Sequence, residues 1–256
     1  MSEEYKKVLV LHTMVKGVER KQKFFAGVED VGVLALTEGP ETTLSRTDGA
    51  LSAADTIRKA VEAERDGYKA IVLSCHGDPE LYPLREAVRI PVLGTMEIAM
   101  RFCAMLSHKF SVLVPELWIK RQQEDNAIRY GLESKIASIR VVSFRNPLAE
   151  VSELALRRPI PQGIIEPALG ECIKAIEEDD ATAITFGCGC FTGMGEELGR
   201  QLKAKGFDVL VINPLPLAVE VARALINLGL TQSALAYPPA ELPDNICDKS
   251  RNYLSS

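Results

Sequence analysis

The sequence predicts an α/β fold made of two similar lobes, each built on a parallel sheet. Two observations carry this prediction. Short apolar strands alternate with helical stretches along the chain, and a strand that ends in cysteine occurs once in each half. Apolar strands separated by helices are typical of parallel sheets that are covered on both faces. The 256 residues are enough for one large domain or two small ones.

In the first half, the pattern predicts four strands with helices between them. The expected strands are 8–11, 31–36, 70–74 and 90–93, and the expected helices are 51–66, 81–89 and 96–107. Gly67 is expected to end the first of these helices, because glycine readily adopts the left-handed conformation found there. Asp78-Pro79 predicts the start of the second helix, with the aspartate as N-cap and the proline in the first helical position.

The same alternation resumes in the second half. The expected strands are 110–114, 137–143, 181–186 and 209–212, and the expected helices are 119–130, 169–178, 196–205 and 217–228. The proline-rich segment 146–167 interrupts the pattern and is expected to form a long loop or lid. Its Arg157-Arg158 pair is either a clamp for a substrate carboxylate or a solvated charge pair. Residues 237–256 are expected to form an extended strap on the surface.

The two halves resemble each other in sequence. Residues 69–75 (Lys-Ala-Ile-Val-Leu-Ser-Cys) are similar to residues 182–188 (Thr-Ala-Ile-Thr-Phe-Gly-Cys), and each segment is followed by a helix, a short strand and another helix. This similarity indicates an internal repeat. The alternative is that it reflects only what all parallel α/β units share.

Composition excludes several classes of function. The net charge is −5 and there is no block of Lys and Arg, which argues against a nucleic-acid-binding surface. No apolar run is long enough for a membrane span, and residues 1–7 lack a signal-peptide pattern. Six cysteines are too sparse for a disulfide framework. We therefore expect reduced thiols and a cytoplasmic location.

Cys75 and Cys188 are the candidate catalytic residues. Both follow predicted parallel strands, and ligands of open parallel sheets bind at the carboxyl ends of the strands. Free N–H groups in the turns that follow would lower a thiol pKa. Two thiols on two lobes could remove a proton from one face of a carbon acid and return one to the other face, without metal or organic cofactor. The alternative is that both are inert, buried strand-end cysteines.

At this point the sequence resembles a known family. Residues 75–81 (Cys-His-Gly-Asp-Pro-Glu-Leu) and the later Gly187-Cys188 are similar to motifs of the Asp/Glu/hydantoin racemase superfamily, especially its hydantoin and allantoin racemases. Weaker matches are 90–94, 129–132, 228–230 and 39–42 (Gly-Pro-Glu-Thr), the last of which resembles the family's Gly-Pro-x-Ser. The resemblance extends from about residue 8 to residue 230.

The resemblance implies two pseudo-symmetric α/β lobes with the active site in the cleft between them. It also implies cofactor-independent racemisation of a small carbon acid, hydantoin-like or derived from an amino acid, by Cys75 and Cys188. Because the last helix of the family usually packs back on the first domain, we expect a first lobe of residues 1–107 plus 215–256 and a second of residues 108–214. The family often forms homo-oligomers, and we expect one here, with neither nucleic acid nor membrane as partner.

The residues expected to contact substrate lie beside the two cysteines or where the chain departs from the family. His12 stands where the family has Asn-Pro-Asn, Pro115 stands where it often has Thr-Thr, and Thr42 takes the place of its serine. The remaining expected contacts are His76, Gly77, Gly189 and Cys190. His76 could instead face solvent, and Cys190 could instead form a metal or redox pair with Cys188, although no further Cys or His stands at metal-binding spacing.

Two other functions remain open on the sequence alone. One is a cysteine-dependent cis–trans isomerase or decarboxylase of a dicarboxylate, like the maleate isomerases and arylmalonate decarboxylases. The other is a two-lobed ligand-binding protein without turnover. The sequence leaves the substrate and its preferred enantiomer open.

Overall fold

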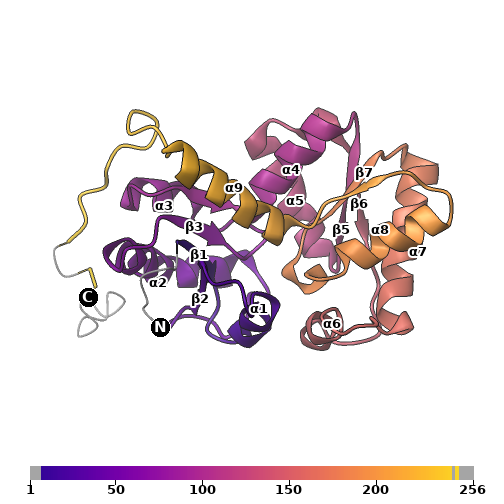
Figure 1. Cartoon of the computed structure of the whole chain (residues 1–256), viewed down its shortest axis with the longest axis horizontal. Coiled ribbons are helices and arrows are strands. Elements are labelled where there is room, and N and C mark those ends of the chain that lie inside the picture. Colours follow the sequence, from indigo (N-terminus) through magenta and orange to yellow (C-terminus); the bar gives the residue numbers. More distant parts are fainter. Residues whose placement is uncertain (1–6, 244–245, 248–256) are drawn as a thin grey trace. The chain divides into compact units, whose positions relative to one another are not determined.

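The computed structural model describes residues 7–243 and 246–247 and divides the chain into two compact units. The first unit consists of Met1–Ser74, Asp78–Gly94 and Val219–Ser256, and the second consists of Cys75–Gly77 and Thr95–Ala218. Each unit contains one four-stranded parallel sheet (Figure 1). The division predicted from the sequence, after residues 107 and 214, stays a prediction. Residues 1–6, on which the signal-peptide argument rests, lie outside the described part.

The first unit has the strand order β2-β1-β3-β4, and all of its pairings are parallel. The strands are β1 (Val8–His12), β2 (Val31–Ala35), β3 (Ala70–Leu73) and β4 (Val92–Gly94). The helices are α1 (Val18–Phe24), α2 (Arg46–Arg65), α3 (Leu81–Ala87) and the later part of α9 (Pro214–Leu228). The central strands β1 and β3 are buried along their whole length. Each fully buried aliphatic side chain contributes about 1.5–3 kcal/mol.

The second unit has the strand order β6-β5-β7-β8, again with every pairing parallel. The strands are β5 (Phe110–Val114), β6 (Ile136–Val141), β7 (Ala183–Phe186) and β8 (Leu210–Val211). The helices are α4 (Thr95–Leu106), α5 (Leu117–Tyr130), α6 (Leu148–Leu154), α7 (Gln162–Asp179) and α8 (Gly195–Ala204), and two 3-10 turns cover Glu133–Lys135 and Gly189–Phe191. Figure 1 shows α4 and α5 on one side of this sheet and α7 and α8 on the other.

The predicted two-lobed α/β fold and its internal repeat are confirmed. The orders β2-β1-β3-β4 and β6-β5-β7-β8 are the same topology, with the third strand of each unit next to the first. The two similar segments of the sequence form β3 and β7, the third strands. Each of the two cysteines therefore follows the third strand of a sheet, although the turn of Cys75 itself belongs to the second unit.

The start of α2 and the N-cap of α3 differ from the prediction. Helix α2 begins five residues earlier than expected, because Ser45 caps it: its Oγ accepts a hydrogen bond from the N–H of Asp48 at 3.2 Å. Helix α3 begins at Leu81 with Glu80 as its N-cap, so the prediction that Asp78 caps this helix is wrong. Asp78 and Glu80 both have positive φ angles, 46° and 55°, which delay the helical conformation.

The prediction of a long loop or lid over 146–167 is also wrong, because most of this segment is helical. Pro147 and Pro161 are the N-caps of α6 and α7, so they mark helix starts, where a missing N–H costs nothing. The helices form because Val151 and Ile165 are fully buried in the core of the second unit. Arg158 donates to the carbonyl oxygens of Ala155, Arg157 and Gly193 and so ties its turn to the turn before α8. Helix α1 was not expected.

The segment after α9 lies against the first unit. Gln232 pairs with both the N–H and the C=O of Val92, which covers the open edge of β4. Further along, the Tyr237 hydroxyl accepts from Arg85 and the Ala240 N–H donates to Glu86 O. The described start of the predicted strap is thus held on α3, whereas 244–245 and 248–256 lie outside the described part. Within the described residues, no helix is long and apolar enough to cross a membrane.

Candidate active site

Cys75 and Cys188 stand at equivalent places, each two residues after the last residue of a third strand. Both side chains are partly exposed, and no disulfide links any of the six cysteines, all of which are described. Cys103 and Cys172 differ sharply, since both are fully buried in helices. Burial raises the pKa of each of these two thiols to about 12. The partly exposed thiols of Cys75 and Cys188 are therefore suited to acid–base chemistry, whereas the buried thiols of Cys103 and Cys172 are not.

The turn that carries Cys75 is hydrogen-bonded to the end of β7, the strand that precedes Cys188. His76 is buried, and its Nδ1 lies 2.8 Å from the carbonyl oxygen of Phe186, the last residue of β7. A carbonyl can only accept, so Nδ1 holds the proton and donates it. The alternative that His76 faces solvent is therefore wrong. Cys75–Gly77 accordingly belongs to the second unit, although β3 belongs to the first.

Gln123 of α5 joins the same two turns a second time. Its fully buried side-chain Nε2 donates to His76 O at 2.8 Å and to Gly187 O at 3.1 Å. His76 follows the first cysteine directly, and Gly187 precedes the second one directly. One primary amide thus uses its two N–H groups to hold the two cysteine-bearing turns to each other.

Close packing supports this arrangement. A Cβ atom placed on Gly187 would lie 2.8 Å from Gln123 Cγ and 2.7 Å from Val114 Cγ1, so only glycine lets α5 approach the end of β7 this closely. Asn126, one turn further along α5, donates to Gly77 O at 3.4 Å and to Gln123 Oε1 at 3.3 Å. Because Asn126 occupies Oε1, the Nε2 end of the Gln123 amide faces the two carbonyls.

Cys188 is the N-cap of the 3-10 turn that follows it. Its Sγ accepts from the N–H of Cys190 at 3.5 Å. A hydrogen bond from a backbone N–H favours the thiolate over the thiol. Cys190 itself is buried, at 4 % exposure. Among the described residues, no three His, Cys, Asp or Glu side chains are grouped so that they could hold a metal ion.

In the first unit, His12 closes the carboxyl end of β1. Its Nε2 lies 2.9 Å from Lys16 O and its Nδ1 lies 3.3 Å from Ser74 Oγ. Burial lowers the pKa of His12 from 6.5 to about 4, so the ring is neutral at pH 7. Nε2 therefore carries the single proton, and Nδ1 accepts from the hydroxyl of Ser74, the residue before Cys75. Its contact with substrate stays a prediction.

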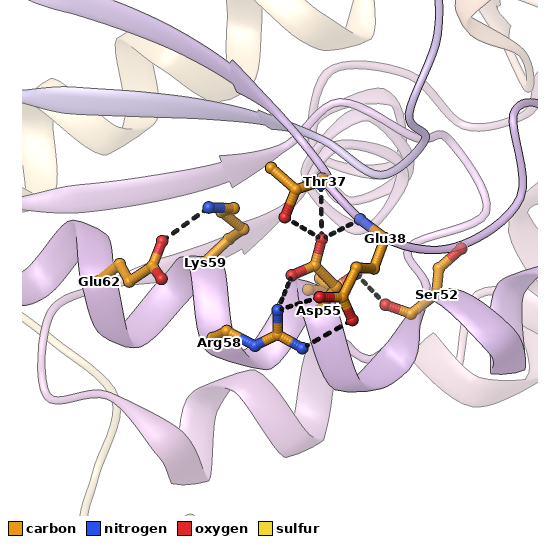
Figure 2. A network of polar contacts seen from close by, with 8 residues as sticks. Thr37, Glu38, Ser52, Asp55, Arg58, Lys59 and Glu62 are labelled. Atoms are coloured by element: carbon orange, nitrogen blue, oxygen red, sulfur yellow. Dashed lines mark hydrogen bonds and ion pairs between the residues drawn. The ribbon is translucent and has the colours of Figure 1, made fainter. Parts of the chain in front are cut away.

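Thr42 lies on the loop between β2 and α2, and this loop is held by a buried carboxylate. Asp55 Oδ2 accepts from the backbone N–H groups of Thr37 at 2.6 Å and Glu38 at 2.9 Å (Figure 2). Its Oδ1 pairs with Arg58 at 3.0 Å, and Arg58 in turn donates to Glu38. The Asp55 and Arg58 side chains are only 3 % and 4 % exposed. This network fixes the start of the loop.

The same loop is also tied to the one after β1. Val15 N–H donates to Pro40 O and Lys16 N–H donates to Glu41 O. Thr42 itself is exposed, directly after these contacts. Hydrogen bonds, together with the short stretch of chain from Glu38 to Glu41, therefore connect Asp55 through both loops to His12 and Ser74. In the second unit, Pro115 is buried between β5 and α5.

The structure brings together the two cysteine turns predicted from the sequence. These turns contain His76, Gly77, Gly189 and Cys190. Thr42 and His12 are joined through backbone contacts of the first unit. Sequence reasoning missed Gln123 and Asn126, although a signal was present. The buried face of α5 consists of Ile119, Gln123, Asn126, Ala127 and Tyr130, so two amides interrupt an otherwise apolar stripe. Polar groups in such a stripe need buried partners.

The family follows from comparison with known proteins. Residues 13–222 match the family model described as Asp/Glu/Hydantoin racemase. The chain belongs to the Asp/Glu/hydantoin racemase family. As a member of a racemase family it is assigned to the isomerases, in agreement with the resemblance noted in its sequence.

Individual members of the Asp/Glu/hydantoin racemase family cover most of the chain. A hydantoin racemase from Pseudomonas sp. (strain NS671) is 31% identical over 224 residues, which are 87% of this chain and 84% of that protein. A hydantoin racemase from Rhizobium meliloti is 31% identical over 205 residues, 79% of this chain and 80% of the relative. The allantoin racemase structure from Klebsiella pneumoniae has the same fold, with a TM-score of 0.78 at 22% identity over 94% of this chain and 97% of the other.

Proposed function

We propose that this protein is a cofactor-independent racemase or epimerase that uses Cys75 and Cys188 as its acid and base. The substrate class is a carbon acid that is hydantoin-like or derived from an amino acid. The support from the chain's relatives is the 31% identity to two hydantoin racemases. The single structural observation behind the proposal is that the turns bearing the two thiols are bonded to each other through His76 and Gln123.

The proposed reaction needs only a proton in and a proton out. One cysteine, as thiolate, accepts the proton from the stereogenic carbon and becomes a thiol, leaving an enolate. The other cysteine, as thiol, donates its proton to the opposite face of that carbon and becomes a thiolate. The product is the mirror-image centre, and the reverse reaction restores the starting protonation. General acid–base groups of this kind contribute between about 10² and 10⁴ in rate.

The hydrogen bond from Cys190 N–H to Cys188 Sγ supports a thiolate at the second position. The other substrate-binding roles belong to the same proposal, with His12 and Pro115 at strand ends, Thr42 on the loop between β2 and α2, and Gly77, Gly189 and Cys190 close to the two thiols. His76 has its Nδ1 engaged by Phe186 O, so its role in the proposal is to hold the turn.

The proposal is tested by incubating the enzyme with single enantiomers of 5-substituted hydantoins and of allantoin in D₂O. We expect optical rotation to decay and deuterium to appear at the stereogenic carbon, with activity unchanged after dialysis against a chelator. C75S and C188S should each lose between about 10² and 10⁴ of the rate. C247S is the matched control, since Cys247 is also partly exposed but lies after the last described helix.

Other results would replace the proposal. Full activity in the C75S/C188S double variant would contradict a two-thiol mechanism. A covalent adduct with an unsaturated dicarboxylate, seen by intact mass spectrometry, would indicate a cis–trans isomerase instead. Release of CO₂ from a malonate would indicate a decarboxylase.

A further inference from the structure

The amide of Gln123 forms hydrogen bonds to both cysteine turns from a third element, helix α5. Its two N–H groups reach His76 O and Gly187 O, at 2.8 Å and 3.1 Å, from a side chain that is fully buried. Gly187 O belongs to the peptide unit that joins Gly187 to Cys188, and His76 O belongs to the unit that joins His76 to Gly77, one residue beyond Cys75. Because a peptide unit is planar, holding Gly187 O restrains the unit that leads directly into Cys188. Holding His76 O restrains the turn directly after Cys75.

We infer that Gln123, oriented by Asn126, is a positioning residue that sets the placement of the Cys75 and Cys188 thiols relative to each other. This inference rests on the proposed function for its catalytic meaning, but not for its structural content. Proton transfer from a fixed carbon to two opposite partners tolerates little displacement of either, because an error of about 1 Å can cost about 10²-fold in rate. Because a helix is stiff, a side chain of α5 that contacts both turns limits this displacement.

Asn126 has a separate part in this arrangement. By donating to Gln123 Oε1 it fixes which end of the amide faces the carbonyls, and by donating to Gly77 O it holds the first turn alone. Loss of Gln123 should therefore loosen both turns. Loss of Asn126 should loosen the first turn more than the second, since it has no contact with Gly187 among the described hydrogen bonds.

The decisive variant is Q123M, which keeps the length of the side chain and removes both donors. We expect kcat to fall between about tenfold and a hundredfold, with KM changed less than about threefold. The matched control is I119V, which trims a buried residue on the same face of α5 and leaves both carbonyls with their donor. A loss that appears only in KM, or a kcat equal to that of I119V, would overturn the inference.

A second readout does not depend on turnover. The rate of iodoacetamide alkylation at Cys75 and Cys188 is followed peptide by peptide as a function of pH, with Cys247 in the same chain as the reference thiol. In Q123M we expect both rates, relative to Cys247, to change at least about threefold, and the pH midpoint of Cys188 to rise. That rise follows because Cys188 no longer holds its sulfur against the Cys190 N–H.

The alkylation experiment distinguishes a failure of the proposed racemase function from a failure of the positioning role inferred for Gln123. If the wild-type enzyme racemises no candidate, the proposed function fails, whereas coupled changes at both thiols still support the role of Gln123. A change at Cys188 with none at Cys75 would overturn it. If Q123M does not fold, N126A decides: a change at Cys75 that exceeds the one at Cys188 supports the inference, and equal or absent changes overturn it.

Discussion

The loops at the carboxyl ends of β1 and β2 in the first unit are held by ionised or ionisable groups, whereas the turns at β7 in the second unit are held by two neutral amides together with the buried ring of His76. Asp55 and Arg58 anchor one loop of the first unit, and His12 anchors the other. In the second unit, Gln123 and Asn126 hold the two cysteine turns by donating hydrogen bonds to backbone carbonyl oxygens. The sheet topology is the same in both.

This difference has a physical consequence. A buried ion pair is strongly destabilising when one partner is removed, because the remaining charge keeps its desolvation cost without compensation. A neutral amide leaves only unsatisfied hydrogen-bonding groups, at about 1–3 kcal/mol each. Stability that comes from a titratable group also depends on pH, whereas stability that comes from an amide does not. The contacts of Asp55 and Arg58 should therefore be more sensitive to substitution than those of Gln123 and Asn126, and the contacts of His12 should be more sensitive to acid.

The largest expected effect is on Asp55. D55A removes the acceptor for Thr37 and Glu38 N–H and leaves Arg58 buried with only the half-exposed Glu38 as partner. We expect a loss of about 3–5 kcal/mol in the free energy of unfolding, measured by urea denaturation. D55N, which retains one acceptor oxygen, should lose less. A loss below that of Q123M would reverse the comparison between the two units.

The next effect is the pH dependence that His12 imposes. Its pKa is about 4 in the folded protein and 6.5 in the unfolded chain, so the unfolded chain binds more protons between these values. The stability from neutral His12 is fully present above pH 6.5 and is lost as the pH falls toward 4, by roughly 3 kcal/mol in total. H12Q can still donate to Lys16 O but does not titrate. Its unfolding free energy should fall less between pH 7 and pH 4.5 than that of the wild type, and equal slopes would contradict this account.

The smallest expected effect tests whether burial is the reason that the loss of Asp55 is so destabilising. Arg223 of α9 pairs with Asp30 at 2.6 Å, the same chemistry as Arg58 with Asp55, but these side chains are 28% and 30% exposed. The Arg223 guanidinium lowers the pKa of Asp30, yet water screens the pair. R223M should therefore cost less than about 1 kcal/mol in thermal or urea denaturation. A cost similar to that of D55A would mean that ion pairing alone, regardless of burial, stabilises the first unit.

The cysteine pattern of the sequence predicts the local structure correctly, whereas the proline pattern does not, and the reasons are physical. A strand that ends in cysteine could be recognised twice because β periodicity and residue identity are local. The helices α6 and α7 were missed because Pro147 and Pro161 were interpreted as loop residues, whereas buried Val151 and Ile165 decide the conformation. Whether a proline starts a helix or lies in a loop depends on whether the following apolar residues find a core.

The sequence alone determined the α/β class, the repeat of β3 and β7, the family and the two candidate thiols, because periodicity and short motifs are written into neighbouring residues. Only the tertiary structure decided that His76 and Gln123 tie the two cysteine turns together, and that Asp55 anchors the loop of Thr42. These contacts join residues 17 to 110 positions apart in the chain. Their partners are mostly backbone carbonyls and N–H groups, which nearly every residue has. The two amides in the apolar stripe of α5 indicate that buried partners exist, but the sequence does not identify those partners.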